Sequence, residues 1–298
     1  MSPLKYITRI SLACLYAIAL LGAPNGYAQC LGLSQGQMAQ ALSWSGNPVV
    51  GDTYKVKRWY VQDGDSLSLA NGHRLRLGQI NTTEMASKGR PEQAYAQQGK
   101  DQLTQKLHQQ DAIYLQLLPE VKDHYGRWLV KLYDGAGQSA EAFLVAQGLA
   151  YVINMNRQGA ERCLWQEEGA ARIQNLGIWQ APISRVHNAA ILNANQGGFM
   201  RMGGTVTDIS ESQRHWYIGL GGKVAVKIPK DVLATSRFRI NTSKQLERWI
   251  GQTVVARGWL AWRKLSKKQR EKGFKAGVMS IDHLRMLEQP PVQSLLKE

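Results

Sequence analysis

The chain has 298 residues and a formal net charge of +15. Its length allows one or two domains, and its charge favours polyanionic partners, either nucleic acid or an anionic membrane surface. Six histidines are scattered without the spacing of metal ligands, so the sequence argues against a zinc site.

The first residues have the order of a secretory signal. Lys5 and Arg9 precede an apolar run over residues 10–21, and the small residues of Gly26-Tyr27-Ala28 follow. This order predicts cleavage after Ala28 and a periplasmic or secreted protein. The run is shorter than the roughly 20 apolar residues of a membrane span, and an uncleaved anchor is the alternative. Loss of Lys5 and Arg9 would lower the charge from +15 to +13.

Two cysteines would remain after removal of residues 1–28, which contain Cys14. Cys30 lies in a polar N-terminal extension (residues 29–52), and Cys163 lies in a predicted helix. An oxidising compartment favours a disulfide between them. Two free or buried thiols are the alternative.

The first predicted domain, residues 53–181, combines strands with helices. An Asn71-Gly72 turn between two alternating segments is a strong hairpin signal. Strands are predicted over residues 53–61, 65–69, 73–80, 112–118 and 127–133, and helices over residues 91–108, 139–148 and 160–176. This pattern predicts a mainly β, α+β fold, in which helices surround a small five-stranded barrel.

A second, smaller domain is predicted over residues 199–288, after a linker over residues 182–198 and before a tail over residues 289–298. The linker is rich in Asn, Gln and Gly. Strands are predicted over residues 204–209, 215–220, 223–228, 253–262 and 278–284, with a helix over residues 243–250. Three strands, a helix and two strands is the element order of an oligonucleotide-binding (OB) barrel.

Polar residues at the ends of the first-domain strands suggest phosphate chemistry. Asp63-Gly64-Asp65 ends one predicted strand and opens the next, Arg76 lies on the strand after that, and Glu84 lies just beyond its end. Carboxylates at loop ends bind hard cations, and Arg76 and Arg127 could hold the oxygens of a phosphate diester. Glu84 could accept a proton from the attacking water. Surface ion pairs on a barrel are the alternative.

Three ordered motifs carry a resemblance to a known family. They are Val-Gln-Asp-Gly-Asp-Ser (61–66), Arg-Leu-Gly-Gln-Ile-Asn-Thr-Thr-Glu (76–84) and Asp-His-Tyr-Gly-Arg (123–127). They resemble the thermonuclease, or staphylococcal-nuclease-like, motifs Val-x-Asp-Gly-Asp-Thr, Arg-Leu-x-x-Ile-Asp-Thr-Pro-Glu and Asp-Lys/Arg-Tyr-Gly-Arg. The resemblance covers roughly residues 53–180, and the shared order makes it specific.

The resemblance implies an OB-type barrel with three helices and a calcium-dependent nuclease that leaves 3′-phosphate ends. DNA is the expected substrate, RNA is a second one, and little sequence specificity is expected. The implied residues are the Ca²⁺ ligands Asp65, Asn81 and Thr82, the catalytic residues Arg76, Glu84 and Arg127, and Tyr125 at a terminal phosphate.

Two positions depart from the family pattern. Asn81 replaces an aspartate ligand, and Thr83 replaces a proline. Asn81 can still offer a carbonyl oxygen, but a unit charge near a divalent ion is lost. Such a pair attracts by about 4 kcal/mol at about 4 Å near a surface. We therefore expect weaker calcium binding.

A basic segment in the second domain could contact nucleic acid. Lys264, Lys267 and Lys268 lie between its last two predicted strands, after Trp259 and Trp262. This loop lines the binding groove of many OB barrels, and tryptophans stack on bases. A solvated basic loop with core tryptophans is the alternative.

Three functions are consistent with these patterns. The first is an exported nuclease, which the joint presence of the site residues favours. The second is a catalytically weakened or inactive nucleic-acid-binding protein of the cell envelope, which Asn81 and Thr83 favour. The third is an envelope protein whose basic second domain holds an anionic polymer or lipid.

Overall fold

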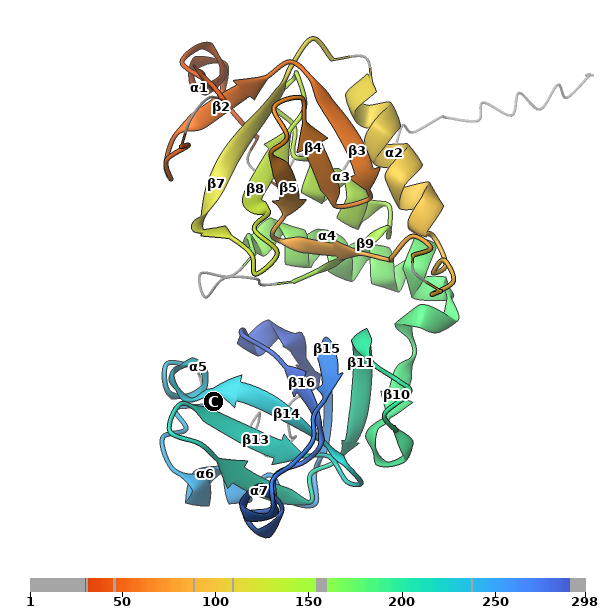
Figure 1. The fold of residues 1–298 in the computed structure, drawn as a ribbon, viewed down its shortest axis with the longest axis vertical. Coiled ribbons are helices and arrows are strands. Elements are labelled where there is room, and N and C mark those ends of the chain that lie inside the picture. The colour runs from red at the N-terminus through yellow and green to blue at the C-terminus, as the bar shows by residue number, and fades with distance from the viewer. Residues whose placement is uncertain are drawn as a thin grey trace, which may run out of the picture.

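The computed structural model describes residues 30, 32–44, 47–87, 89–108, 110–153, 160–236 and 238–289. It contains two sheet-based domains joined along one side, with α4 and β9 of the first facing β11 and β15 of the second (Figure 1). The predicted signal peptide lies outside the described residues, as does the tail beyond residue 289. No helix among the described residues is both long and apolar enough to cross a bilayer.

The first domain is built on a seven-stranded sheet. Its elements are α1 (Gln35–Ala39), β1 (Leu42–Ser43), β2 (Thr53–Val56), β3 (Trp59–Asp63), β4 (Ser66–Leu69), β5 (Arg74–Leu77), β6 (Ile80–Thr82), α2 (Ala96–His108), β7 (Ile113–Lys122), β8 (Trp128–Tyr133), α3 (Ala140–Ala146), β9 (Ala150–Val152) and α4 (Arg162–Ile173). The strand order is β1-β2-β7-β8-β5-β4-β3. The mainly β character with helices is as predicted.

The single strand predicted over residues 53–61 is instead two strands. β2 pairs with β7 and β3 pairs with β4, so the two segments lie at opposite ends of the strand order. Only the exposed residues Lys57 and Arg58 separate them. A short bend therefore brings the two ends of the sheet together, as in a curled OB-type barrel.

Leucines on β4 and β5 point into this barrel. Leu67, Leu69, Leu75 and Leu77 are at most 5% exposed and belong to one core cluster. Burial of each such side chain contributes about 1.5–3 kcal/mol before the cost of chain entropy. This packing fixes β5, the strand that carries Arg76.

The strand predicted over residues 73–80 also divides in two. β5 ends at Leu77, and β6 pairs only with β9 in a separate two-stranded sheet, with Ile80 opposite Val152. At the division, a Cβ on Gly78 would lie 2.4 Å from Leu118 Cδ1. Glycine permits this close approach, and the chain leaves the barrel there.

The predicted helices of the first domain are present but shorter than expected. α2 begins at Ala96 rather than at residue 91, and α4 spans Arg162–Ile173. Ser139 caps α3 as predicted, because Ala142 N donates to Ser139 Oγ at 3.1 Å.

The second domain contains an eight-stranded sheet. Its elements are β10 (Val186–Asn188), β11 (Gly198–Thr205), β12 (Asp208–Glu211), β13 (His215–Gly219), β14 (Val224–Pro229), α5 (Lys230–Ala234), α6 (Ser243–Glu247), β15 (Thr253–Trp262), α7 (Lys267–Glu271), β16 (Gly277–Ser280) and β17 (Leu287–Gln289). The order is β10-β11-β15-β16-β14-β13-β12, and β17 pairs with β15. No ladder joins β11 to β12 within the described residues, so this sheet is not the closed barrel that the sequence predicted.

The segment predicted as a linker has structure of its own. β10 pairs with β11 in parallel, and Ala189 and Leu192 are buried in the second core. Short 3-10 turns occupy Pro182–Ser184 and Ala189–Ile191. The connection therefore packs against the second domain.

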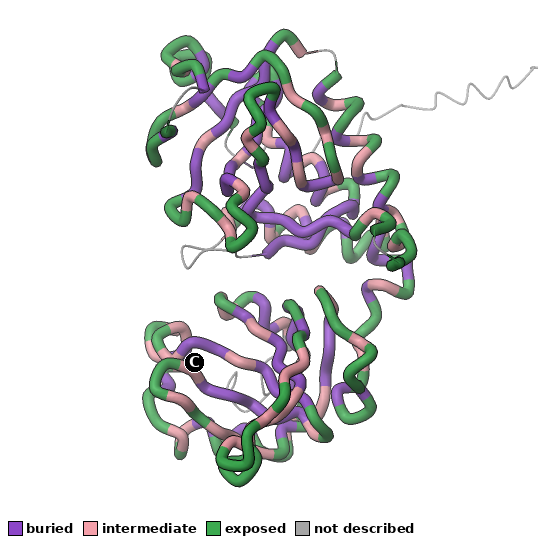
Figure 2. The backbone as a smooth tube through the Cα atoms, viewed as in Figure 1, coloured by how far each residue is buried: buried purple, intermediate pink, exposed green. Residues whose placement is uncertain are grey.

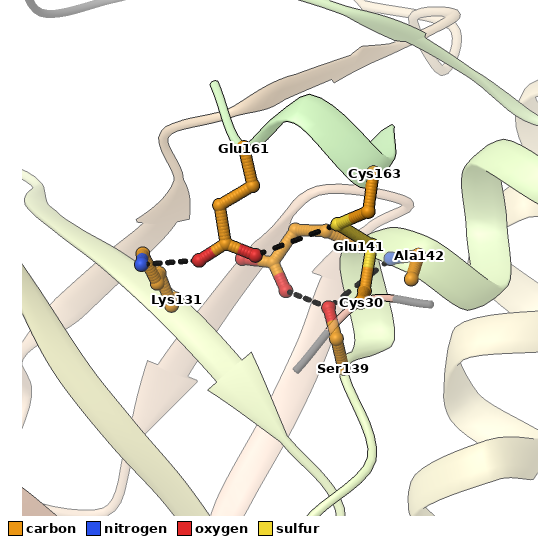
Figure 3. Close-up of a disulfide and its surroundings, with 7 residues drawn as sticks. All are labelled: Cys30, Lys131, Ser139, Glu141, Ala142, Glu161 and Cys163. Atoms are coloured by element: carbon orange, nitrogen blue, oxygen red, sulfur yellow. Dashed lines mark hydrogen bonds and ion pairs between the residues drawn. A yellow bond between two sulfur atoms is a disulfide. The ribbon is translucent and has the colours of Figure 1, made fainter. Parts of the chain in front are cut away.

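The N-terminal extension is attached to the barrel at several points. Cys30 and Cys163 form a disulfide that links the extension to α4 (Figure 3). Met38 of α1 packs on Tyr114 and Tyr133, and Trp44 Nε1 donates to His73 Nδ1 at 2.7 Å. The extension is thus part of the folded domain.

Replacing both Cys30 and Cys163 with serine should lower the free energy of unfolding by about 2–5 kcal/mol, because the disulfide closes a loop between residues 133 positions apart. Denaturant midpoints of the double variant and the oxidised parent would measure the loss. A reductant should shift the parent's midpoint and leave that of the double variant in place. An equal shift in both would contradict a stabilising disulfide.

Candidate active site

A buried arginine organises the end of the barrel at β5 and β6. Arg76 is 3% exposed, and its Nη1 donates to the carbonyls of Leu77 (2.7 Å) and Ile80 (2.9 Å). Its Nη2 lies 2.9 Å from Asp65 Oδ2 and donates to Asn81 Oδ1 at 2.9 Å. Nη1 therefore fixes the guanidinium to the backbone, and Nη2 faces the acidic residues.

Asp65 joins the β3–β4 turn to strand β6. Besides its ion pair with Arg76, its Oδ2 accepts from Thr82 N at 2.9 Å, and its Oδ1 accepts from Ser66 Oγ at 2.9 Å. The carboxylate is 5% exposed. A buried carboxylate needs such partners, and these three groups hold the Asp65 side chain in place.

The amide of Asn81 bridges two other site groups. Its Oδ1 accepts from Arg76, and its Nδ2 donates to the Thr82 carbonyl at 3.1 Å. This orientation satisfies both neighbours, because one is a donor and the other an acceptor. The two oxygens predicted as metal ligands at positions 81 and 82 are thus both in hydrogen bonds.

Arg127 approaches from the start of β8. Its Nε lies 2.8 Å from Asp123 Oδ2, and its Nη1 donates to Ser66 Oγ at 3.2 Å. Burial raises the pKa of Asp123, but hydrogen bonds from Arg127 outweigh it and lower the pKa overall. With 24% of its side chain exposed, Arg127 is more open to a substrate than Arg76.

Two further carboxylates share this region. Burial, together with the charges of Asp65 and Glu84, raises the pKa of Asp63 to about 6. Glu84 is exposed, but partial desolvation by neighbouring atoms and the charge of Asp65 raise its pKa overall, while Arg76 and Arg127 act to lower it. The four predicted residues Asp65, Arg76, Glu84 and Arg127 therefore lie within electrostatic reach of one another.

Glu84 itself is exposed, and its backbone is fixed by Gln93. Glu84 N donates to Gln93 Oε1 at 2.8 Å, and Gln93 N donates to Glu84 O at 3.0 Å. The side chain is thus carried on an anchored loop beyond β6.

The remaining predicted contacts lie farther from this cluster. Tyr125 is 63% exposed, with its ring centroid 5.5 Å from Arg127 Cζ. Lys264, Lys267 and Lys268 are exposed residues of the second domain. α7 lies at the end of that domain away from the first (Figure 1), in an exposed loop (Figure 2). The basic segment is therefore a separate surface.

Sequence reasoning gave no role to several residues that position the site. Ser66 links Asp65 to Arg127, Asp123 orients Arg127, and Gln93 holds Glu84. Asp123 stands four residues before Arg127 in the Asp-His-Tyr-Gly-Arg motif, and this spacing could have indicated the ion pair between them. Gln93 carries no comparable signal.

A curled β sheet that brings two arginines to acidic side chains at one end is typical of an OB-type domain. The family model described as "Staphylococcal nuclease homologue" matches residues 74–181. This part of the first domain is therefore similar to the staphylococcal nuclease family, and the similarity suggests a nuclease-type function. The match does not extend to the second domain, and no curated protein matches the chain.

The predicted ligands suit a hard cation only in part. Asp65 supplies a carboxylate, but among the described residues the oxygens of Asp63, Asp65 and Glu84 do not gather closely enough to form a three-carboxylate site. The Thr82 carbonyl also already accepts from Asn81. A calcium ion on the predicted ligands would compete with that hydrogen bond.

Replacing Asn81 with aspartate should tighten calcium binding about tenfold. The new carboxylate oxygen would face the Thr82 carbonyl, and retaining a third of the roughly 4 kcal/mol charge attraction gives this factor. Without calcium, the variant should unfold at a lower temperature than the parent. Calcium titration of the unfolding temperature would measure the change.

Asn71→Asp adds the same charge at the exposed hairpin turn and serves as the control. It should leave the calcium dependence unchanged. Equal calcium responses of Asn81→Asp and the parent would argue against a metal site at this position.

Proposed function

We propose that the protein is an exported, calcium-dependent nuclease that hydrolyses phosphodiester bonds of DNA, and also of RNA, with little sequence specificity. The observation that carries this proposal is the convergence of Arg76, Arg127, Asp65 and Glu84 from separate segments of the barrel. Export is supported by the signal-like first residues and by the Cys30–Cys163 disulfide.

The two arginines would bind the scissile phosphate. Arg127 Nη1 lies beside Ser66, and Arg76 Nη2 lies beside Asp65, so both guanidinium groups face the same acidic region. Fixed positive charges stabilise the phosphate oxygens as negative charge accumulates in the transition state. A bound calcium ion would add to this charge neutralisation.

Glu84 would accept the proton of the attacking water. The pKa of Glu84 is raised and so lies closer to neutral pH than that of an ordinary glutamate. A carboxylate with a higher pKa is a stronger base while it remains ionised. Asp65 holds β6 through Thr82 N and thereby keeps Glu84 near the arginines. Tyr125, exposed beside Arg127, is positioned to contact a terminal phosphate.

Glu84→Gln should lower cleavage of single-stranded DNA about 10²–10⁴-fold, and Arg127→Ala about 10²–10³-fold, at saturating calcium. The parent's rate should fall as the pH drops through the pKa of Glu84, and Glu84→Gln should lack this decline. Arg58→Ala removes an exposed arginine outside the site and should retain the parent rate. A calcium titration on single-stranded DNA, double-stranded DNA and RNA, with analysis for 3′-phosphate ends, provides the measurement.

The inactive-binder alternative predicts a different result. It requires salt-sensitive binding without new 3′-phosphate ends, whatever the calcium concentration. Parent-like rates in both Glu84→Gln and Arg127→Ala would remove the proposed site.

We also propose that the second domain is OB-like and adds nucleic-acid affinity. Its strands follow the same order as those of the first barrel, and Lys264, Lys267 and Lys268 are exposed. Trp259 is 36% exposed and could stack on a base. Since α7 lies far from the first-domain site (Figure 1), these lysines would bind the nucleic-acid strand at a distance from the cleaved bond.

Changing Lys264, Lys267 and Lys268 together to alanine should weaken single-stranded DNA binding. The slope of log affinity against log salt should decrease by about 2, given about 0.7 for each lost phosphate contact. The maximal cleavage rate should not change. Lys244→Ala with Arg248→Ala, two exposed cations elsewhere on the domain, is the control, and an equal change there would refute a specific basic surface.

A further inference from the structure

The outer edge of β9 is completed by side chains rather than by another strand. Val152 N donates to Glu168 Oε1 of α4 at 2.6 Å, and Val152 O accepts from Arg257 Nη2 at 2.8 Å. Arg257 belongs to β15 of the second domain. The two side chains thus satisfy a buried peptide edge as a neighbouring strand would.

Arg257 and Glu168 form a fixed pair between the domains. Arg257 is 1% exposed, and its two Nη atoms donate to the two Glu168 carboxylate oxygens at 2.8 Å each. Its guanidinium also lies 5.0 Å from the Trp165 ring centroid. A two-pronged pair of this kind fixes distance and orientation together.

β9 pairs with β6, so fixing the position of β9 also fixes β6 and the site groups that β6 carries. Tyr151 and Ala150 of β9 pair with Asn81 and Thr82 of β6, and Val152 pairs with Ile80. The Ile80 carbonyl binds Arg76 Nη1, and Thr82 N binds Asp65. β6 has no other neighbouring strand in the described residues, so a shift of β9 would move groups that hold Arg76 and Asp65.

A second interdomain ion pair lacks this connection. Arg172 of α4 lies 3.7 Å from Glu288 of β17, and Glu288 also pairs with Arg201 of β11 within the second domain. The contacts of Arg172 with Glu288 and with the Trp179 ring involve neither β9 nor β6. Arg172 therefore offers a control for general docking of the domains.

We propose that Arg257 of the second domain is a positioning residue for the nuclease site of the first. It holds β9, and through β9 the β6 groups that orient Arg76 and Asp65. The second domain is then a required support of catalysis. This inference rests on the proposed nuclease function.

The test compares Arg257→Met/Glu168→Gln with Arg172→Met, full-length and well below their unfolding temperatures. Each variant removes an interdomain ion pair, and Glu288 keeps Arg201 as a partner when Arg172 is changed. For Arg257→Met/Glu168→Gln, kcat should fall about 10- to 100-fold with KM unchanged, as expected when reacting groups are misplaced. Arg172→Met should keep the parent kcat.

Amide hydrogen exchange gives a readout that does not depend on activity. The amides of Asn81 and Thr82 should exchange faster in Arg257→Met/Glu168→Gln than in Arg172→Met. Arg257→Lys keeps the charge but not the two-pronged geometry, and it should show the same changes to a smaller extent. It replaces the double variant if the latter does not fold.

Parent-like kcat and exchange in a folded Arg257 variant would overturn the inference, and so would equal losses in the Arg257 variant and in Arg172→Met. A parent without nuclease activity would instead overturn the proposed function. In that case, hydrogen exchange at Asn81 and Thr82 would still decide whether Arg257 supports β6.

Discussion

The ion pair between Arg76 and Asp65 is the interaction on which the rest of the site depends. Both groups are almost completely buried, so neither charge would be tolerable without the other and its hydrogen bonds. Arg76 reaches two carbonyls near the β5–β6 bend, and Asp65 reaches Thr82 N. The pair therefore ties β4, β5 and β6 together at the end of the barrel where the other polar residues gather.

Next to this pair, Asn81 stands where the family motif has an aspartate, so the site carries one negative charge less. Asn81 supplies an N–H to the Thr82 carbonyl, which makes that contact attractive without an ion. Burial, followed by the charge of Asp65, raises the pKa values of Asp63 and Glu84. The chain thus places negative charge around Asp65, while the Asn81 amide occupies the carbonyl that was predicted to bind a metal.

The two domains are linked by more than the chain between them. Arg257 and Glu168 bury a two-pronged ion pair at the interface, and Arg172 of α4 lies 3.7 Å from Glu288 of β17. Tyr151 of β9 also lies near the rings of Trp179 and Phe199. Breaking one partner of such a buried pair costs about 3–5 kcal/mol, so the relative placement of the domains is specific. Because Arg257 bonds Val152 of β9, and β9 pairs with β6, this interface also supports β6.

The sequence by itself indicated the family that the first domain resembles, most of its strands and helices, and the candidate site residues. Those features are local: alternating leucines, the Asn71-Gly72 turn, the Ser139 cap and three short motifs. Tertiary structure decided where the strands over residues 53–61 and 73–80 divide, because those bends depend on barrel closure and on the contact of Gly78 with Leu118. It also decided the hydrogen bonds of Asn81, the support of Glu84 by Gln93 and the contact of Arg257 with Val152. Arg257 and Val152 are 105 residues apart in the chain, and only the packing of two folded domains brings them together.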